Sequence, residues 1–364
     1  MIESSSFRNV LFGAAGMMVL FLVCTPVQSQ QSSQTLNVNP SDYDSYAVSQ
    51  AQDVKRHARP ANTPAAKEAR PSEVSNSHLS VPGWVGPPAP DSGGPRFPGD
   101  LQYHGGAVVK SVQQHLIFVN LSKSTSCHTV ATCWGNPFGF LQDMGQSDFI
   151  HVTDQYVGSH MDGRYTVSQT TVNVNYPVGP HPFTDLDMLI IVHAVATHFG
   201  TGYDNLYHVF LVPGQDECFD STYSVCYSPD NAASFFFCAY HGSATFKDIG
   251  HVLYSVEPFQ DVDGCSVRPG TPNGQLADST NSVLSHETFE TITDPDGDAW
   301  WNSLNNGLFG QEIADECSFL IFPTATTAFF DPSNVTLNGK KYAAQPEYNN
   351  ASHACTTRPS LFGD

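Results

Sequence analysis

Short apolar runs with polar boundaries recur along the C-terminal two thirds of the chain and predict the strands of a buried sheet. They are HLIFVNL, YHVFLV, SFFFCAY and HVLYS, at residues 115–121, 207–212, 234–240 and 251–255. Runs of this length between polar or turn residues are typical of core strands. Residues 165–176 (YTVSQTTVNVNY) instead alternate apolar and polar side chains, which predicts an edge strand.

Two longer segments predict helices. Residues 186–198 (LDMLIIVHAVATH) are too many for an ordinary strand, and a glycine follows them as a stop signal. Residues 279–293 should form a helix that has Asp278 or Ser279 as its N-cap and ends before Pro295. Strands and helices do not alternate regularly, so the predicted fold class is α+β or mixed α/β, with the second helix packed on a mixed sheet.

The N-terminal part of the chain differs in composition. Residues 30–100 contain few large apolar side chains and are rich in Gln, Ser, Ala and Pro, and residues 81–98 are dense in Pro and Gly. Such a segment buries too little apolar surface to offset the entropy of ordering it. We therefore predict a disordered linker or pro-segment at 30–100 and a single globular domain at 101–364.

The first 29 residues have the features of a secretory signal peptide. Arg8 provides a positive charge, residues 10–23 are apolar, and Ser29 closes a small-residue cleavage site. The alternative is a membrane anchor, but the apolar run is shorter than the ~20 residues that a spanning helix needs. We expect a secreted, extracellular protein. Three sequons predict N-glycosylation in a eukaryotic host: Asn120, Asn334 and Asn350.

The cysteine count also favours export. Cys24 lies in the signal peptide, and the eight others are Cys127, Cys133, Cys218, Cys226, Cys238, Cys265, Cys317 and Cys355. An even set in an oxidising compartment predicts up to four disulfides. We expect the cysteines to pair in sequence order, because the first two pairs are close and flanked by turn-forming residues. A cysteine-rich metal site is the alternative, but the chain has no C-x-x-C pair.

The charge balance excludes some classes of partner. The chain has 35 acidic and 15 basic residues, for a formal net charge of −20. Nucleic acids and anionic membranes bind clustered Lys and Arg, so we expect neither as a partner. The G-x-S-x-G elbow of serine hydrolases and the phosphate-binding glycine motifs are also absent, so no nucleotide cofactor is indicated.

The helix predicted at 279–293 carries the main candidate chemistry. Its stretch SHETFETITDP begins with a His-Glu pair, as in the zincin motif H-E-x-x-H, but Glu290 replaces the second histidine. Residues four apart share a helix face, so His286 and Glu290 could bind one zinc ion at ~2.0–2.2 Å. Glu287 occupies the place of the zincin general base, which takes a proton from water on the metal.

A catalytic zinc ion usually has three protein ligands and one open position. The run QEIADEC offers Asp315 as the third ligand, with Glu312 as second choice, because Cys317 could tether the turn that holds Asp315. His241 follows an apolar strand and is a candidate fourth ligand or substrate-polarising residue. The alternative is an acidic helix that carries one histidine by chance.

A calcium site is a further candidate. Asp294, Asp296 and Asp298 alternate in the run DPDGD and resemble part of a calcium-binding loop. The later acidic ligand of an EF-hand is missing at its proper spacing, so a plain acidic turn is the alternative.

The pattern S-H-E-x-x-x-x-[IV]-T-D-P, followed by a Trp and by E-I-A-D-x-C, resembles the phosphate-induced protein/EXORDIUM-like family, particularly its microbial members. The matching pieces keep their order between residues 101 and 320: 103–106 (YHGG), 237–241 (FCAYH), 285–295, 299–301 (AWW) and 312–317. The resemblance implies a secreted, cysteine-containing α/β domain. It also implies a link to growth regulation at the cell wall, although plant members typically lack the His-Glu pair that this chain retains.

Two functions are consistent with these features. The first is a secreted zinc hydrolase, most concretely a peptidase, acting on a peptide or a cell-wall or matrix polymer. Zinc would be held by His286, Glu290 and Asp315, with Glu287 as general base. The second is a non-catalytic extracellular module of the EXORDIUM type, which binds wall or matrix components or regulates growth and whose helix holds a structural metal or none.

Overall fold

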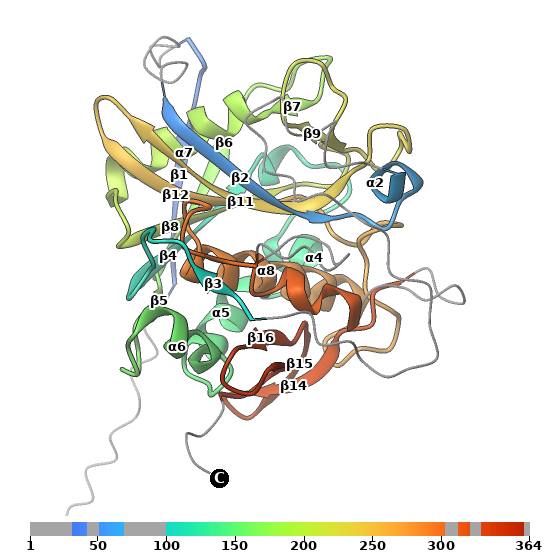
Figure 1. Ribbon diagram of the computed structural model, residues 1–364. Helices are drawn as coiled ribbons and strands as arrows, with labels where there is room; N and C mark the ends of the chain where they lie inside the picture. The colour runs from blue at the N-terminus through green and yellow to red at the C-terminus, as the bar shows by residue number, and fades with distance from the viewer. Residues whose placement is uncertain (1–30, 42–50, 69–99, 303–311, 321–328, 360–364) are drawn as a thin grey trace, which may run out of the picture. The chain divides into compact units, whose positions relative to one another are not determined.

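A twisted mixed sheet forms the centre of the molecule (Figure 1). The computed structural model describes residues 31–41, 51–68, 100–302, 312–320 and 329–359; the predicted signal peptide and residues 69–99 lie outside this part. The strands of the sheet are β1 (Ser32–Asn37), β2 (Gln52–Pro60), β4 (Val112–Val119), β5 (Tyr165–Val167), β6 (Thr170–Asn175), β8 (Asn205–Leu211), β11 (Phe237–Phe246) and β12 (Gly250–Glu257). Their order is β1-β6-β4-β8-β12-β11-β2, with β5 beside β4. Neighbouring strands are parallel from β1 to β12, whereas β11 is antiparallel to both β12 and β2.

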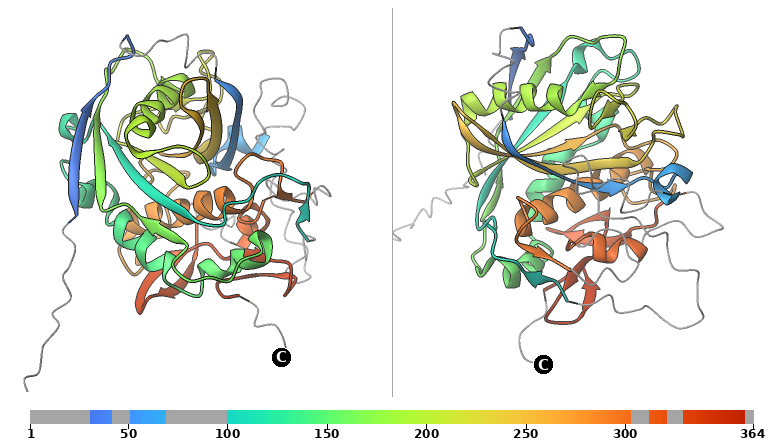
Figure 2. Two further views of the ribbon diagram at one scale, coloured as in Figure 1. Left: turned by 90° about the vertical axis from the view of Figure 1, so that its left-hand side faces the viewer. Right: turned by 45° about the horizontal axis from the view of Figure 1, so that its top comes forward.

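Helices cover both faces of the sheet and give three layers (Figure 2). α7 (Asp185–Phe199) lies on one face and α8 (Gln275–Thr293) on the other. Successive side chains of a strand point to opposite faces, so each central strand contributes to two cores. In β8, for example, Tyr207 packs in the core on the α7 side and Leu206 in the core on the α8 side.

Shorter elements surround these layers. The other helices are α2 (Pro64–Glu68), α4 (Val130–Trp134), α5 (Pro137–Gly145) and α6 (Asp154–Val157), with 3-10 turns η1 (Leu121–Lys123), η2 (Ile150–Thr153) and η3 (Asp315–Leu320). The small sheets pair β3 (Gln102–Tyr103) with β13 (Trp300–Trp301), β14 (Ser333–Leu337) with β15 (Lys340–Ala344), β16 (Glu347–Asn349) with β17 (Ala354–Thr356), and β9 (Glu217–Cys218) with β7 (Phe183–Thr184) and β10 (Cys226–Tyr227). α4, α5 and β15 pack against α8, so α8 is enclosed between the large sheet and the C-terminal hairpins.

Two strands of the large sheet come from the segment predicted to be a linker or pro-segment. β1 pairs with β6 and β2 pairs with β11. The prediction is therefore wrong for residues 31–41 and 51–68, and the compact unit begins at residue 31 rather than 101. A strand poor in apolar residues can still join the edge of an existing sheet, because the backbone supplies the hydrogen bonds. The few apolar side chains of these segments, such as Val38 after β1 and Ala58 in β2, are then buried by the rest of the domain.

The predicted fold class is confirmed as a mixed α/β domain stabilised by disulfides. The four predicted core strands and both helices are present, with ends shifted by a few residues. Residues 165–176 form β5 and β6, and β6 is not an edge strand because β1 covers it. α8 begins at Gln275, earlier than predicted, because Asp278 is not its cap. The carboxylate of Asp278 accepts a hydrogen bond from the backbone of Asn273, before the helix starts.

α8 is rich in polar residues and yet is buried along most of its length. Its threonine hydroxyls donate to the carbonyl oxygen four residues earlier, as at Thr288, Thr291 and Thr293, so they need no other partner. Leu284 and Phe289 anchor the helix in the apolar core. The carboxylates of α8 cannot donate hydrogen bonds to the helix backbone in this way. Their buried charge must be compensated by groups from other parts of the fold.

The cysteines of the described chain pair in sequence order, as predicted: Cys127–Cys133, Cys218–Cys226, Cys238–Cys265 and Cys317–Cys355. Four disulfides fit a protein that folds in an oxidising compartment. Among the described residues, no helix combines the length and the apolar character needed to cross a membrane.

The three sequons differ in accessibility. Asn334 is exposed on β14. Asn120 is buried, and its side-chain oxygen accepts a hydrogen bond from the backbone of Tyr176. The glycosylation prediction is wrong at Asn120, because a buried amide nitrogen leaves no room for a glycan. Asn350 is half-buried and its amide donates to the carbonyl of Leu101.

The structure predicts that the N-terminal strands are part of the folding unit. A chain beginning at residue 31 should unfold cooperatively on heating. A chain beginning at residue 100 lacks β1 and β2, so it should lose most of the roughly 5–15 kcal/mol of stability that a domain has. Thermal unfolding followed by circular dichroism measures both, and equal melting temperatures would contradict the assignment of β2 to the sheet.

Candidate metal centre

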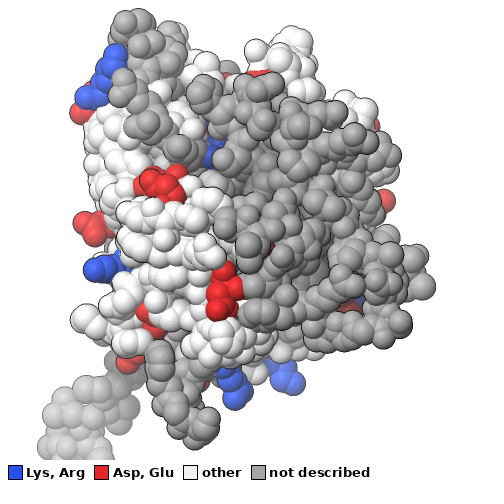
Figure 3. Space-filling model, viewed as in Figure 1, with Lys and Arg blue, Asp and Glu red and all other residues white. Residues whose placement is uncertain are grey.

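The interior of the described chain holds many more acidic than basic side chains. Six aspartates and seven glutamates are buried there, whereas the buried basic residues are Arg59 and Arg164. Figure 3 shows that on one face the visible Lys and Arg lie in small separate groups among Asp and Glu. A buried carboxylate is costly unless a cation, a hydrogen-bond donor or a proton compensates it. Several of these carboxylates gather between α8 and the strands β2 and β11, which makes this region the candidate functional site.

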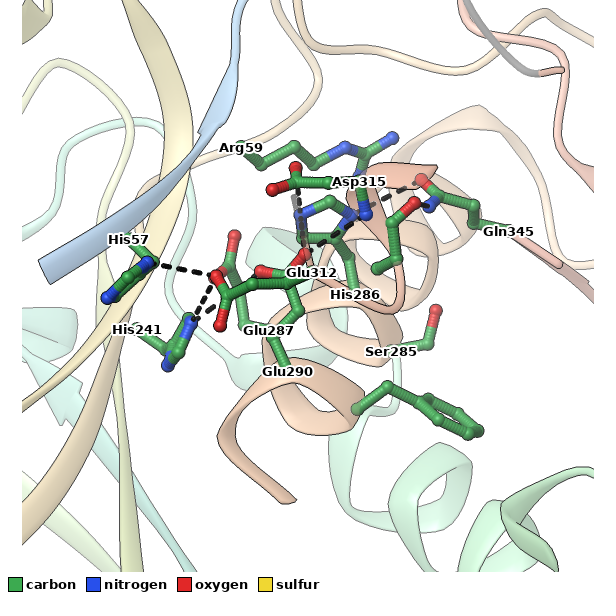
Figure 4. A network of polar contacts seen from close by, with 12 residues as sticks. His57, Arg59, His241, Ser285, His286, Glu287, Glu290, Glu312, Asp315 and Gln345 are labelled. Atoms are coloured by element: carbon green, nitrogen blue, oxygen red, sulfur yellow. Dashed lines mark hydrogen bonds and ion pairs between the residues drawn. The ribbon is translucent and has the colours of Figure 1, made fainter. Parts of the chain in front are cut away.

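Two imidazoles reach this region from adjacent strands. His57 on β2 and His241 on β11 are directly opposite in the antiparallel register, so their side chains share a face of the sheet. Their rings stack with centroids 5.1 Å apart. Both point to Glu312 (Figure 4). Oε2 of Glu312 lies 3.0 Å from Nδ1 of His57 and 3.3 Å from Nε2 of His241.

The three side chains predicted as zinc ligands also come together. Nε2 of His286 lies 3.1 Å from Oε1 of Glu290 and 3.7 Å from Oδ1 of Asp315. His286 and Glu290 are one helical turn apart on α8. The backbone N–H of Asp315 donates to Glu290 at 3.2 Å, and the Cys317–Cys355 disulfide ties the same segment to β17. These three buried side chains could hold a metal ion.

Gln345 sets the protonation of His286. The amide nitrogen of Gln345 donates to the carbonyl of Ala314, so its Oε1 faces Nδ1 of His286 at 3.3 Å. Nδ1 must then carry the proton, and Nε2 is left with a lone pair directed at Glu290 and Asp315. Although it is close to both carboxylates, Nε2 makes no hydrogen bond to any described residue. A second partner that fixes the tautomer in this way is typical of histidine metal ligands.

Glu287, the predicted general base, lies beside this group. Its carboxylate is buried, and neither oxygen has a hydrogen-bond partner among the described residues. Ligand atoms of His241, Glu287 and Glu290 lie within 4.8 Å of one another. Burial raises the pKa of Glu287 well above its usual range, and the neighbouring Glu257 raises it further. A general base needs a carboxyl group that can take up a proton, and the raised pKa of Glu287 favours its protonated form.

Glu312 lies with His57 and His241 rather than with His286. Burial favours the neutral form of Glu312, but the two imidazoles outweigh it and hold the pKa of this carboxyl well below its usual range. Burial likewise lowers the pKa of His57, and the charge of Glu312 reverses this and raises it to about 9. Glu312 was the second choice for the zinc ligand set at His286, and the structure places it in an adjacent set instead.

Arg59 is the basic side chain of this acidic region. It is buried on β2, donates to Oγ of Ser282 at 3.4 Å and lies over the ring of Phe330 at 4.8 Å. Burial lowers its pKa to about 10, and nearby carboxylates, Glu287 first among them, limit that decrease. Arg59 therefore stays charged at neutral pH.

The side chains that β2 and the C-terminal hairpins supply to this region were not predicted from the sequence. His57 and Arg59 lie in the segment taken for a linker, and Gln345 and the buried Glu347 lie beyond the family resemblance. One signal for β2 exists, because residues 52–59 lack the Pro, Gly and Ser that fill the surrounding segment. No sequence pattern distinguishes Gln345 or Glu347.

The calcium prediction gains no support from the side chains of this run. Asp294 accepts a hydrogen bond from the backbone of Ala299, and Asp296 accepts one from Ser243 and lies 3.1 Å from His251. Among the described residues, the clusters able to hold a metal do not include Asp294, Asp296 or Asp298. Neighbouring protein groups therefore already contact the carboxylates of Asp294 and Asp296, as in a plain acidic turn.

Comparisons with protein-family models, with curated proteins and with solved structures each found no match to this chain. The resemblance to the phosphate-induced protein/EXORDIUM-like family therefore stays a prediction that rests on the sequence motifs. The function has to be inferred from the side chains of the site.

We predict that the charge of Arg59 is essential to stability. In the presence of a chelator, Arg59→Met should lower the free energy of unfolding by about 3–5 kcal/mol, because it leaves buried carboxylates without their cation. The control is Arg268→Met, which removes an exposed ion pair with Asp331 and should cost less than about 1 kcal/mol. Urea unfolding measures both, and similar small losses would show that protons compensate the buried carboxylates.

Proposed function

We propose that this protein is a secreted, zinc-dependent hydrolase that acts on peptide bonds. One observation carries the proposal. His286, Glu290 and Asp315 converge with ligand atoms within 4.8 Å of one another, and the unpartnered carboxylate of Glu287 lies beside them. One imidazole and two carboxylates form a donor set that suits zinc and leaves a position open for water. The disulfides and the predicted signal peptide support secretion.

The spacing of the ligand atoms supports a small tetrahedral ion. Bonds of ~2.0–2.1 Å in a tetrahedral shell place neighbouring ligand atoms about 3.3 Å apart. The two separations from Nε2 of His286, 3.1 Å to Glu290 and 3.7 Å to Asp315, lie on either side of that value. Small side-chain movements would therefore complete the shell.

The proposed chemistry is the addition of water to an amide carbonyl. When bound, zinc would supply Lewis acidity, which acidifies water and polarises the carbonyl. Glu287 takes a proton from the attacking water as the new C–O bond forms. It passes that proton to the leaving nitrogen as the C–N bond breaks, and it ends the cycle ionised. Its buried position, without a competing hydrogen bond among the described residues, suits both transfers.

A second candidate function is a non-catalytic extracellular module with a structural metal, which binds cell-wall or matrix polymers. The burial of His286, Glu290 and Asp315 favours it, because structural sites are closed to solvent. The two candidates differ in whether the metal site turns over a substrate.

Glu287→Gln separates these functions. The purified variant should retain the metal content of the wild type, because Glu287 is not in the proposed ligand set. Its rate of hydrolysis of labelled casein should fall about 10²–10⁴-fold, since the base is lost. Metal analysis and a fluorescence release assay measure the two effects. A wild-type protein that holds metal without hydrolysing the substrate would favour the binding module, and a metal-free wild type would refute both metal-based functions.

Gln345 is predicted to be a positioning residue for the metal. Gln345→Leu removes the acceptor of the Nδ1 proton of His286 and should weaken zinc affinity about 10–100-fold. Gln345→Glu keeps an acceptor oxygen and should lose less. Competition with a chromogenic zinc chelator measures both affinities. Equal losses would show that packing, rather than the hydrogen bond to His286, sets the affinity.

A further inference from the structure

A second set of metal-binding side chains lies next to the first. His57, His241 and Glu312 come from β2, from β11 and from the segment that precedes η3, and their ligand atoms lie within 4.8 Å of one another. The imidazole nitrogens are 3.0 and 3.3 Å from the same carboxylate oxygen. These separations match the edge of about 3.3 Å in a tetrahedral zinc shell. Two imidazoles and one carboxylate are also the ligand set of well-known catalytic zinc sites.

Glu290 connects the two sets. Its Oε1 lies 3.1 Å from Nε2 of His286, and its Oε2 lies 3.6 Å from Nε2 of His241. One carboxylate therefore offers a separate oxygen to each group. Centres that hold two metal ions about 3.5–4 Å apart need ligands that reach both ions. Glu287 also lies within reach of both sets, because it groups with His241 and Glu290.

The excess of negative charge in this region is large enough for two divalent cations. Six buried carboxylates surround these sets: Glu257, Glu287, Glu290, Glu312, Asp315 and Glu347. Arg59, a protonated His57 and one divalent ion supply four positive charges against these six carboxylates. Both oxygens of Glu287 and of Glu347, and Oε1 of Glu312, are buried without a hydrogen-bond partner among the described residues. Unpartnered buried oxygens close to imidazole nitrogens are where a further cation is stabilised.

We propose that the centre is binuclear, with a second divalent transition-metal ion bound by His57, His241 and Glu312 and bridged to the first by Glu290. The proposal goes beyond hydrolysis, but it rests on the proposed metal site for the shared ligand Glu290. Two adjacent ions can bind the attacking water and the carbonyl or leaving group separately. The N-terminal strand β2 is then part of the metal centre, because it supplies His57.

The test is metal stoichiometry in the full chain as secreted. The protein is stripped with a chelator, reloaded with Co²⁺ and dialysed, and its cobalt is counted by mass spectrometry. We expect two ions per wild-type chain, one in His57→Gln and one in His286→Gln. The control is His193→Gln, which alters a buried histidine on α7 and should keep two. In the wild type, magnetic coupling between neighbouring ions should reduce the Co²⁺ electron paramagnetic resonance signal relative to the one-ion variants.

The outcomes separate the two proposals. One ion in the wild type that is lost in His286→Gln but kept in His57→Gln would overturn the binuclear centre and leave the mononuclear hydrolase intact. One ion that is lost only in His57→Gln would overturn both. Two ions without magnetic coupling would place the second ion elsewhere and also overturn the binuclear centre. If a variant does not fold, the wild-type count and its coupling still decide.

Discussion

The burial of an excess of negative charge is the constraint on which this structure depends. Glu287, Glu290, Glu312 and Asp315 are all withdrawn from water, and desolvation of an ionised carboxylate costs several kcal/mol unless positive charge lies nearby. Arg59 provides one such charge at a fixed place. The remaining negative charge can be compensated by protons, which raised carboxyl pKa values indicate, or by metal ions. Protons and metal ions therefore compete for the same carboxylates.

The register between β2 and β11 decides which positive groups reach this acidic region. Because side chains on one face of a strand recur every second residue, the register that places His57 opposite His241 also directs Arg59 toward α8. A slip by one residue would turn both side chains to the other face of the sheet. The electrostatics of the site therefore depend on how the backbone of the polar N-terminal segment pairs with β11.

Sequence patterns predicted those strands and helices whose own residues favour the conformation that they adopt in the fold. Apolar runs located the core strands, and the helical spacing of His286 and Glu290 held because a helix fixes which residues share a face. The prediction was wrong for residues 52–60. They contain few apolar side chains, and they form a strand because their backbone pairs with that of β11. Sequence patterns also left Glu312 as the second choice for the set at His286, whereas it lies with His57 and His241. Glu312 and Asp315 are three residues apart, and only the tertiary fold determines that one faces the strands and the other faces His286.

The glutamate at the second ligand position of H-E-x-x-E has a physical explanation in this arrangement. An imidazole presents one nitrogen to a metal and directs its other nitrogen away, toward a second partner. A carboxylate presents two oxygens to the same side. At position 290 the neighbours differ on the two sides, with His286 toward Oε1 and His241 toward Oε2. A histidine there could face only one of the two groups, whereas Glu290 faces both, which is the departure from the zincin pattern that the proposed pair of ligand sets would use.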